Sequence, residues 1–418
     1  MTADTGLRAI RRTLGHRNYA IYVPGNGISL IGTWVQRIAI GWLTWTLTES
    51  GAWLGAVAFA DLAPAVVIGP IGGVIADRFS RIKVIRIAQS LMMVQALALF
   101  ALTASGLITI WAVLGLALAN GVVIGFSQAA RLALVPSLVP RADLSTAVAI
   151  NAITFNLARF IGPAIAGALI VTWGTAPAFA VNGLSYLAFL FALSRLHGIN
   201  DDPSKRAAAS GKTVLGDMVD GLNYAARHTG IGTLLLLMFG LAMGVRPLIE
   251  LMAGFAANVF HGGAEALAIL TAVLGIGAIG GGLWLALRIR TTDRAGLVMV
   301  GAGISSIAAI GFAASQNLYL ALPCVAVIGF CLVVCGVSTQ TLLQLAVDGA
   351  MRGRVLSLYG LIFRGGPALG ALAMGVASEG VGLRWPLAAG SVAVLVLLVW
   401  AWRRHGAVTA AFESGGAD

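Results

Sequence analysis

Twelve long apolar stretches, separated by short polar segments, constrain this chain more than any other feature of its sequence. A helix needs about 20 apolar residues to cross a bilayer, and lipid offers the backbone no hydrogen-bond partner outside the segment itself. Only 10% of the residues are charged, well below the roughly 25% of a soluble domain. We therefore expect an all-α membrane protein with spans near 19–46, 53–76, 84–104, 109–130, 145–171, 175–195, 230–260, 264–288, 295–314, 317–347, 351–378 and 383–402.

The basic residues of the loops predict how the chain is oriented. Four arginines precede the first span, whereas the loops after the odd-numbered spans hold one basic residue, Arg384. The positive-inside rule then places both termini in the cytoplasm, which requires an even number of spans. The net charge of +11 follows from this loop pattern, so we expect a multi-pass protein of the inner (plasma) membrane and no nucleic-acid partner. The first apolar stretch is too long for a cleaved signal peptide, and we expect it to be retained.

A polar segment, 196–229, divides the chain into an N-terminal six-helix bundle, 1–195, and a C-terminal bundle with a cytoplasmic tail, 230–418. Within it, Leu215, Met218, Val219 and Leu222 follow helical spacing, which predicts an amphipathic helix on the cytoplasmic membrane face.

The two halves repeat each other. Arg159 precedes a Gly-Pro pair in the fifth span, Arg364 precedes one in the eleventh, and Arg37 and Arg246 lie in the first and seventh spans. Such an internal repeat is typical of secondary transporters. We therefore expect two pseudo-symmetric bundles, and one chain that holds both halves can work as a monomer.

Six charged residues lie inside the expected spans, although each costs at least about 2.5–3.5 kcal/mol at a helix centre. Four are basic and two acidic: Arg37, Arg159, Arg246 and Arg364, with Asp61 and Glu250. Asp61 and Glu250 are candidates for carrying a coupled proton, because a carboxylate moved between apolar and cationic surroundings changes its pKa. Glu250 can equally neutralise Arg246, and Asp61 can pair with Arg37 as a coupling site or an outer gate. Any of the six can also belong to a structural ion pair.

Further polar residues predict a substrate cavity. The candidates, besides the four embedded arginines, are Asn26, Thr33 and Trp34 in the first span, Asn120 in the fourth, and Gln340 and Gln344 in the tenth. The excess of arginines favours an anionic or hydrogen-bond-accepting substrate.

No motif of an enzyme is found. The sequence has no nucleotide-binding glycine loop with lysine, no cluster of metal-ligand residues and no nucleophile–base pair, and Cys324, Cys331 and Cys335 share one apolar segment as packing residues. We expect no catalysis, no metal and no cofactor.

The loop after the second span reads Gly73-Val-Ile-Ala-Asp77-Arg78-Phe-Ser-Arg81-Ile-Lys83 and resembles the loop signature of the major facilitator superfamily. The stretches Gly32-Thr-Trp34-Val-Gln36-Arg37 and Ala130-Arg131-Leu-Ala-Leu-Val-Pro136 are similar to its bacterial drug- and siderophore-exporter branch, the enterobactin exporter and macrolide efflux group. The resemblance implies the major facilitator fold, a central cavity lined by helices 1, 4, 7 and 10, and a cytoplasmic gate at Gly73, Asp77, Arg78 and Arg81. The corresponding loop after the eighth span keeps only Arg288, Arg290 and Arg294.

We therefore expect a proton-coupled antiporter that exports a small amphipathic or anionic molecule, such as a siderophore, an antibiotic or a secondary metabolite, by alternating access. The alternatives are an uptake carrier or a lipid flippase on the same fold, or a non-transporting membrane receptor. The expected partners are the substrate, protons and the lipid bilayer.

Overall fold

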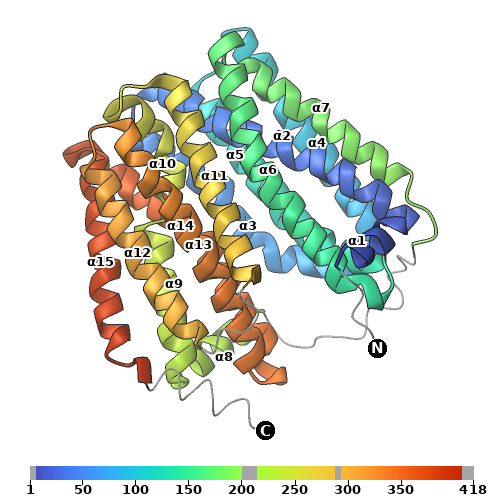
Figure 1. Cartoon of the computed structure of the whole chain (residues 1–418). Helices are drawn as coiled ribbons and strands as arrows, with labels where there is room; N and C mark the ends of the chain where they lie inside the picture. Colours follow the sequence, from blue (N-terminus) through green and yellow to red (C-terminus); the bar gives the residue numbers. More distant parts are fainter. Residues whose placement is uncertain (1–5, 200–213, 288–292, 407–418) are drawn as a thin grey trace. The chain divides into compact units, whose positions relative to one another are not determined.

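The computed structural model describes residues 6–199, 214–287 and 293–406, and these contain helices and no strand (Figure 1). In the first half the helices are α1 (Gly6–Gly15), α2 (Arg17–Thr48), α3 (Gly51–Arg78), α4 (Arg81–Ala104), α5 (Ile110–Leu134), the 3-10 turns η1 (Val135–Ser137) and η2 (Arg141–Asp143), α6 (Leu144–Trp173) and α7 (Ala176–Ser194). In the second they are α8 (Val214–Arg227), α9 (Thr229–Gly244), α10 (Leu248–Gly254), the π-helix η4 (Phe255–Val259), α11 (Gly263–Leu287), α12 (Arg294–Ala314), α13 (Leu318–Ala346), α14 (Gly349–Val381) and α15 (Arg384–Trp402).

The predicted all-helical membrane architecture is confirmed. Eleven helices of the described residues are long and apolar enough to cross a membrane. The remaining span is α2, 32 residues long, whose buried Asn26, Ser29 and Gln36 lower its hydropathy. Arg288 and Arg290 of the eighth-span loop, and residues 200–213 of the expected linker, lie outside the described residues.

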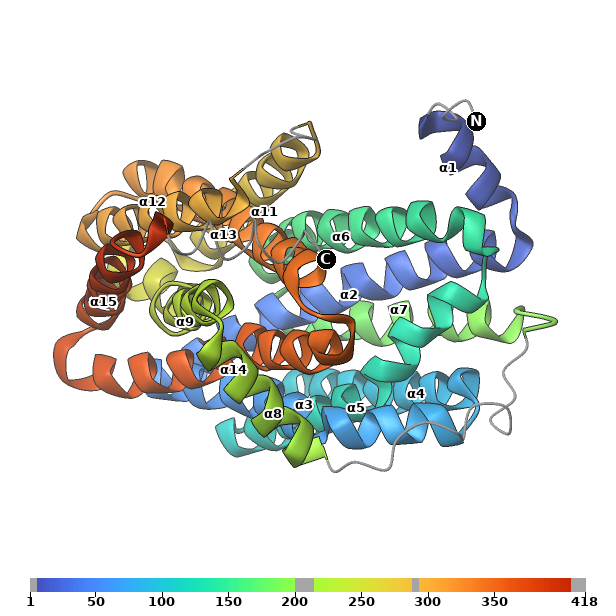
Figure 2. The ribbon, with the colours of Figure 1, turned by 90° about the horizontal axis from the view of Figure 1, so that it is seen from below.

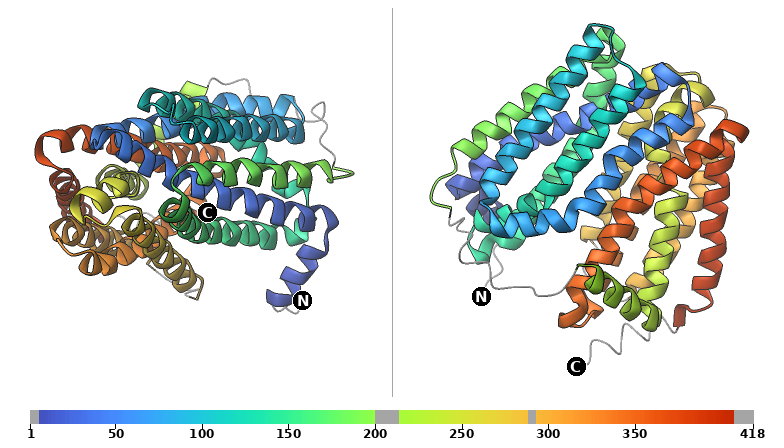
Figure 3. Two further views of the ribbon diagram at one scale, coloured as in Figure 1. Left: turned by 90° about the horizontal axis from the view of Figure 1, so that it is seen from above. Right: turned by 180° about the vertical axis from the view of Figure 1, so that it is seen from behind.

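The chain forms two compact units. Unit 1 comprises Met1–Leu47 with Ala60–Ser210, and unit 2 comprises Thr48–Phe59 with Gly211–Asp418. The first turns of α3 therefore belong to unit 2 and the rest of that helix to unit 1. Figures 2 and 3 show the same helices from below, from above and from behind.

Small residues bring the helices of unit 1 together. A Cβ at Gly25 or Gly32 of α2 would collide with Ala192 or Ser185 of α7, and a Cβ at Gly72 of α3 would collide with the backbone of α5. In a membrane, where lipid tails are as apolar as side chains, such close backbone approach is a main source of helix association. α4 packs against both α5 and α7.

Unit 2 is built in the same way. α13 packs against α11 and α12, and α9 contacts both α14 and α15 (Figure 2). The first turns of α3 join this unit, because Gly55 lies against the backbone of Ala371 and Gly375 lies against that of Gly51. Helix ends are defined by caps: Thr109 and Asn317 accept hydrogen bonds from the first turns of α5 and α13, as N-cap side chains do.

Candidate substrate-binding site

A buried amide network lies at the centre of unit 1. Gln36 of α2 donates to the Gln95 oxygen of α4 at 3.0 Å, and Asn182 of α7 donates to the Gln36 oxygen at 2.8 Å. Gln36 and Asn182 are 4% and 0% exposed. Because unpaired buried amides are costly, this network fixes the rotation of α2 between α4 and α7. Sequence analysis missed it as a site, although Gln36 is part of the quoted stretch beside Arg37.

Fixing α2 orients a cationic and aromatic cluster on its other face, which we call the Trp34 cluster: Trp34, Arg37, Phe155 and Arg159. The guanidinium carbons of Arg37 and Arg159 lie 5.4 and 5.5 Å from the centre of the Trp34 ring, within the range of cation–π attraction. Phe155 meets the same indole edge-on at 6.0 Å. Gly162 of α6 makes room, since a Cβ there would collide with Trp34. The structure thus brings together three of the predicted cavity residues.

A second polar cluster lies nearer the start of α2. Asn26 accepts a hydrogen bond from Arg131 of α5 at 3.0 Å and donates to Asn151 of α6 at 3.3 Å, so one amide joins three helices. Thr33 instead donates to the Ser29 carbonyl of its own helix at 2.8 Å, which satisfies a hydroxyl in a membrane span without a partner helix.

Asp61 of α3 accepts a hydrogen bond from Asn120 of α5 at 2.7 Å. The Asn120 oxygen is buried and has no hydrogen-bond partner among the described residues. The two helices meet here because Gly121 carries no side chain, and a Cβ on it would collide with the Asp61 carbonyl. An embedded carboxylate and an unsatisfied amide oxygen therefore share one small region of unit 1.

The seventh span is broken, which the sequence analysis did not predict. α9 ends at Gly244 and α10 begins at Leu248, and Pro247, which has no N–H, occupies the break. The Arg246 amide bonds to the Leu241 carbonyl and the Ile249 amide to the Arg246 carbonyl. Discontinuous helices of this kind form substrate and ion sites in secondary transporters.

The side chain of Arg246 extends from this break and contacts α14. Its guanidinium donates to the Phe363 carbonyl at 2.8 Å and its carbon lies 3.9 Å from the Phe363 ring centre. Phe363 in turn packs against Tyr359 at 5.7 Å, and Arg364 is the next residue. We call Arg246, Tyr359, Phe363 and Arg364 the Phe363 cluster. Arg364 is exposed and has no hydrogen bond or ion pair with a described residue.

Three further residues of unit 2 were predicted to belong to the site: Glu250, Gln340 and Gln344. Glu250 is half-buried in the first turn of α10, four residues after Arg246. Gln340 and Gln344 of α13 are exposed. The buried polar residues at that level are Ser338 and Thr339, whose hydroxyls have no hydrogen-bond partner among the described residues.

The residues of the predicted cytoplasmic gate differ in their contacts. Arg81 donates to the Ala133 carbonyl at the end of α5, at 2.9 Å, whereas Asp77 and Arg78 are exposed. Of the two adjacent glycines, Gly72 lies against α5, whereas a Cβ at Gly73 would meet no atom within 4 Å.

Glu379 was not singled out from the sequence. Its carboxylate accepts hydrogen bonds from the Ser50 hydroxyl at 2.7 Å and the Ala52 amide at 3.0 Å, so it caps the N-terminus of α3 within unit 2. A carboxylate at this end of a helix meets the positive end of the helix dipole.

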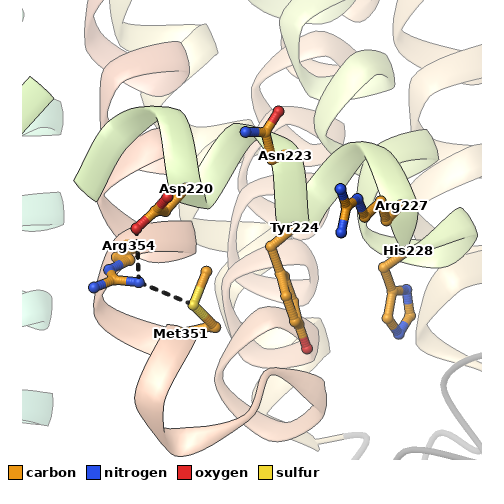
Figure 4. A pocket seen from close by; sticks show the side chains of 7 residues that line it. All are labelled: Asp220, Asn223, Tyr224, Arg227, His228, Met351 and Arg354. Carbon is orange, nitrogen blue, oxygen red and sulfur yellow. Dashed lines mark hydrogen bonds and ion pairs between the residues drawn. The ribbon is translucent and has the colours of Figure 1, made fainter. Parts of the chain in front are cut away.

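The amphipathic helix α8 is bound to α14. Arg354 pairs with Asp220 at 3.2 Å, and Tyr224 donates to Asp348 at 3.1 Å; burial raises the pKa of Tyr224, which keeps its phenol protonated. Figure 4 shows the side chains that line a pocket beside these contacts, about 640 Å³ in volume. Its lining is Asp220, Asn223, Tyr224, Arg227, His228, Met351 and Arg354.

Within the described residues, no group of three or more His, Cys, Asp or Glu side chains is placed to hold a metal ion. Cys331 and Cys335 are buried as free thiols.

The family described as transmembrane secretion effector, within the major facilitator superfamily, matches residues 14–411. The staphyloferrin A transporter of Staphylococcus aureus is 24% identical over 355 residues, which cover 84% of this chain and 87% of the relative. The enterobactin exporter EntS of Escherichia coli K12 is 28% identical over 377 residues, 87% and 85% of the two chains.

Solved structures confirm the predicted fold. The inward-facing, unoccupied bacterial homologue of the human lysosomal transporter Spinster matches with a TM-score of 0.71 at 16% identity, over 96% of this chain and 98% of that one. The nucleoside transporter NupG matches with a TM-score of 0.69 at 16% identity, over 93% and 98%. This multi-pass membrane protein, whose family and structural neighbours are transporters, belongs to the transmembrane secretion effector family of the major facilitator superfamily.

Proposed function

We propose that this chain is a proton-coupled antiporter that exports a small amphipathic or anionic molecule by alternating access. The observation that carries the proposal is the repeated pairing of arginine with aromatic rings. In unit 1, Arg37 and Arg159 flank Trp34; in unit 2, Arg246 lies on Phe363, beside Arg364. The arginines occupy corresponding spans of the two halves.

Guanidinium groups suit a planar anion. Arginine offers several donors in a fixed plane, binds carboxylates in two-point fashion and stacks on aromatic faces. The Trp34 cluster therefore fits a carboxylate or an ionised phenol attached to a flat, partly apolar body. The two relatives named above carry staphyloferrin A and enterobactin, and we propose a siderophore, an antibiotic or another secondary metabolite as the cargo.

The candidates for proton coupling are Asp61 and Glu250. Asn120 of α5 donates a hydrogen bond to Asp61 of α3. A conformational change that separates α3 from α5 would remove this donor and change the surroundings of the carboxylate. Glu250 follows the break in the seventh span, where a change of helix geometry would alter its surroundings most.

The proposed setting is the bacterial inner membrane, with both termini in the cytoplasm and one chain sufficient for transport. We propose that the cytoplasmic gate residues Gly73, Asp77, Arg78 and Arg81 control cytoplasmic access.

Everted membrane vesicles would test the substrate class. We would measure uptake of aromatic carboxylates and catechols against their neutral esters and cationic analogues. We expect the anions to be preferred, and Arg159→Gln or Arg364→Gln to reduce their uptake by about tenfold or more, since charge-assisted hydrogen bonds contribute about 1.5–3 kcal/mol. Arg403→Gln, an exposed arginine after the last span, is the control. Equal uptake of esters and anions, unaffected by both arginine variants, would refute the proposed cargo.

A further inference from the structure

An apolar groove of about 590 Å³ opens on the surface of unit 1, where α3 ends and α4 begins. Its walls come from α3, α4 and the middle of α5, and include Phe79, Ile87, Leu91 and Phe126. This volume is in the range of small-molecule pockets. The groove is separate from the Trp34 cluster, since the two share no residue.

The groove is a surface feature and not a gap in the core. Phe79, Ile87 and Leu91 are 58%, 62% and 50% exposed. For a membrane protein, an exposed apolar wall is normally covered by lipid chains. Both the apolar lining of the groove and the lipid around it therefore favour an apolar occupant.

One end of the groove is cationic. Arg78 and Lys83 belong to its lining, and neither side chain forms a hydrogen bond or an ion pair with a described residue. The neighbouring arginines are engaged: Arg81 donates to Ala133 and Arg86 donates to Leu193. Residues 77–86 include four basic side chains and one acidic side chain, Asp77, so the positive charge of this segment is not neutralised locally.

We propose that this groove binds an anionic phospholipid, with one acyl chain along Ile87 and Leu91 and the phosphate between Arg78 and Lys83. A free anion would leave the apolar walls uncovered, and a zwitterionic lipid would gain less from two cations. The loop charges assign this end of unit 1 to the cytoplasmic leaflet, where basic side chains attract anionic headgroups. The proposal does not depend on the transported cargo.

Native mass spectrometry of the full chain in detergent tests this site. The probes are dioleoyl phosphatidylglycerol and dioleoyl phosphatidylcholine. Each basic side chain near anionic lipid is worth about fivefold in binding, so we expect the first phosphatidylglycerol to bind about 30-fold more tightly than the first phosphatidylcholine.

Variants separate the two parts of the site. We expect Arg78→Gln/Lys83→Gln to remove the preference, and Arg17→Gln/Arg141→Gln, which removes the same charge from exposed positions of unit 1, to retain it. Ile87→Trp, a change at an exposed groove wall, should weaken the binding of both lipids. The proposal is overturned if wild type shows no preference, if the Arg78/Lys83 double variant keeps it, or if the control loses it equally. Displacement of the lipid by excess inorganic phosphate, with no effect of Ile87→Trp, would indicate a free-anion site instead.

Discussion

Substituting alanine for Gly121 should disturb the contact that holds Asp61. An ideal Cβ at Gly121 would lie 2.9 Å from the Ala60 carbonyl oxygen and closer still to that of Asp61. Ordinary contact begins at 3.4 Å, and the opposing atoms are backbone, so α3 and α5 must separate by at least about 0.5 Å.

That separation has two measurable effects. Overpacking of this size costs about 1–3 kcal/mol, which corresponds to a fall in Tm of about 2 to 12 °C for a unit of roughly 200 residues. It also lengthens the 2.7 Å hydrogen bond between Asn120 and Asp61 to about 3.2 Å or more, the long limit for such bonds. We therefore expect Gly121→Ala to lower both the thermal stability and the proposed proton-coupled transport.

Thermal unfolding of the purified chain in detergent, followed by tryptophan fluorescence, measures the first effect. Gly69→Ala in α3 and Gly115→Ala in α5 are matched controls, because a Cβ at either position meets no atom within 4 Å. We expect these controls to keep the wild-type Tm or to exceed it slightly, since alanine favours helix more than glycine does. A Gly121→Ala variant as stable as the controls would refute the close contact of α3 with α5.

Three further perturbations test separate contacts. Asn182→Leu removes a donor from buried Gln36 and should lower the free energy of unfolding by about 1–3 kcal/mol. The double variant with Gln36→Leu should lose less stability than the sum of the two single variants. Strictly additive losses in thermal unfolding would contradict a network. Glu379→Gln weakens the cap on α3, so a cysteine placed at Glu49 in a cysteine-free background should react with an impermeant maleimide about two- to fivefold faster; an unchanged rate would exclude the cap. Asp143 binds Arg12 and His16, each at 2.7 Å, so Asp143→Asn should release α1 and speed tryptic cleavage at Arg11 by about tenfold or more; equal cleavage of variant and wild type would show that these bonds do not hold α1.

The helical architecture was predictable because lipid imposes a simple rule on long apolar segments. Each of the twelve expected spans overlaps helix among the described residues, mostly to within a few residues at each end, and the seventh overlaps a broken helix. The first of these spans corresponds to the long α2, although its buried polar residues lower its hydropathy.

The break in the seventh span illustrates what hydropathy misses. A window average treats 230–260 as one apolar run, and the only sign of interruption is Pro247 directly after Arg246. Proline is tolerated inside other helices of this chain, such as α6 at Pro163, so its presence alone could not locate the break. At the break, Gly370 of α14 packs against Pro247, a contact between residues far apart in the sequence that no local pattern predicts.

Sequence reasoning could identify which residue types belong to the candidate site, but not which side chains they contact. The embedded arginines were found because charge is rare in spans, but their aromatic neighbours Phe155 and Phe363 were not distinguished from other apolar residues. The partnership of Gln36 with Gln95 and Asn182 joins residues 59 and 146 positions apart, and no local pattern encodes such a distance. Gly72 and Gly73 are adjacent, and only the rotation of α3 decides which one meets α5.

We propose that substrate movement is coupled to protons through an embedded carboxylate, Asp61 or Glu250. Proteoliposomes containing a pH-sensitive dye, with an imposed proton gradient, would be given the anionic compounds that the vesicle assay identifies as cargo. We predict substrate-dependent proton flux in wild type, and its loss in Asp61→Asn or in Glu250→Gln. If substrate moves while both variants keep the wild-type proton flux, neither carboxylate couples transport to protons, and both have structural roles.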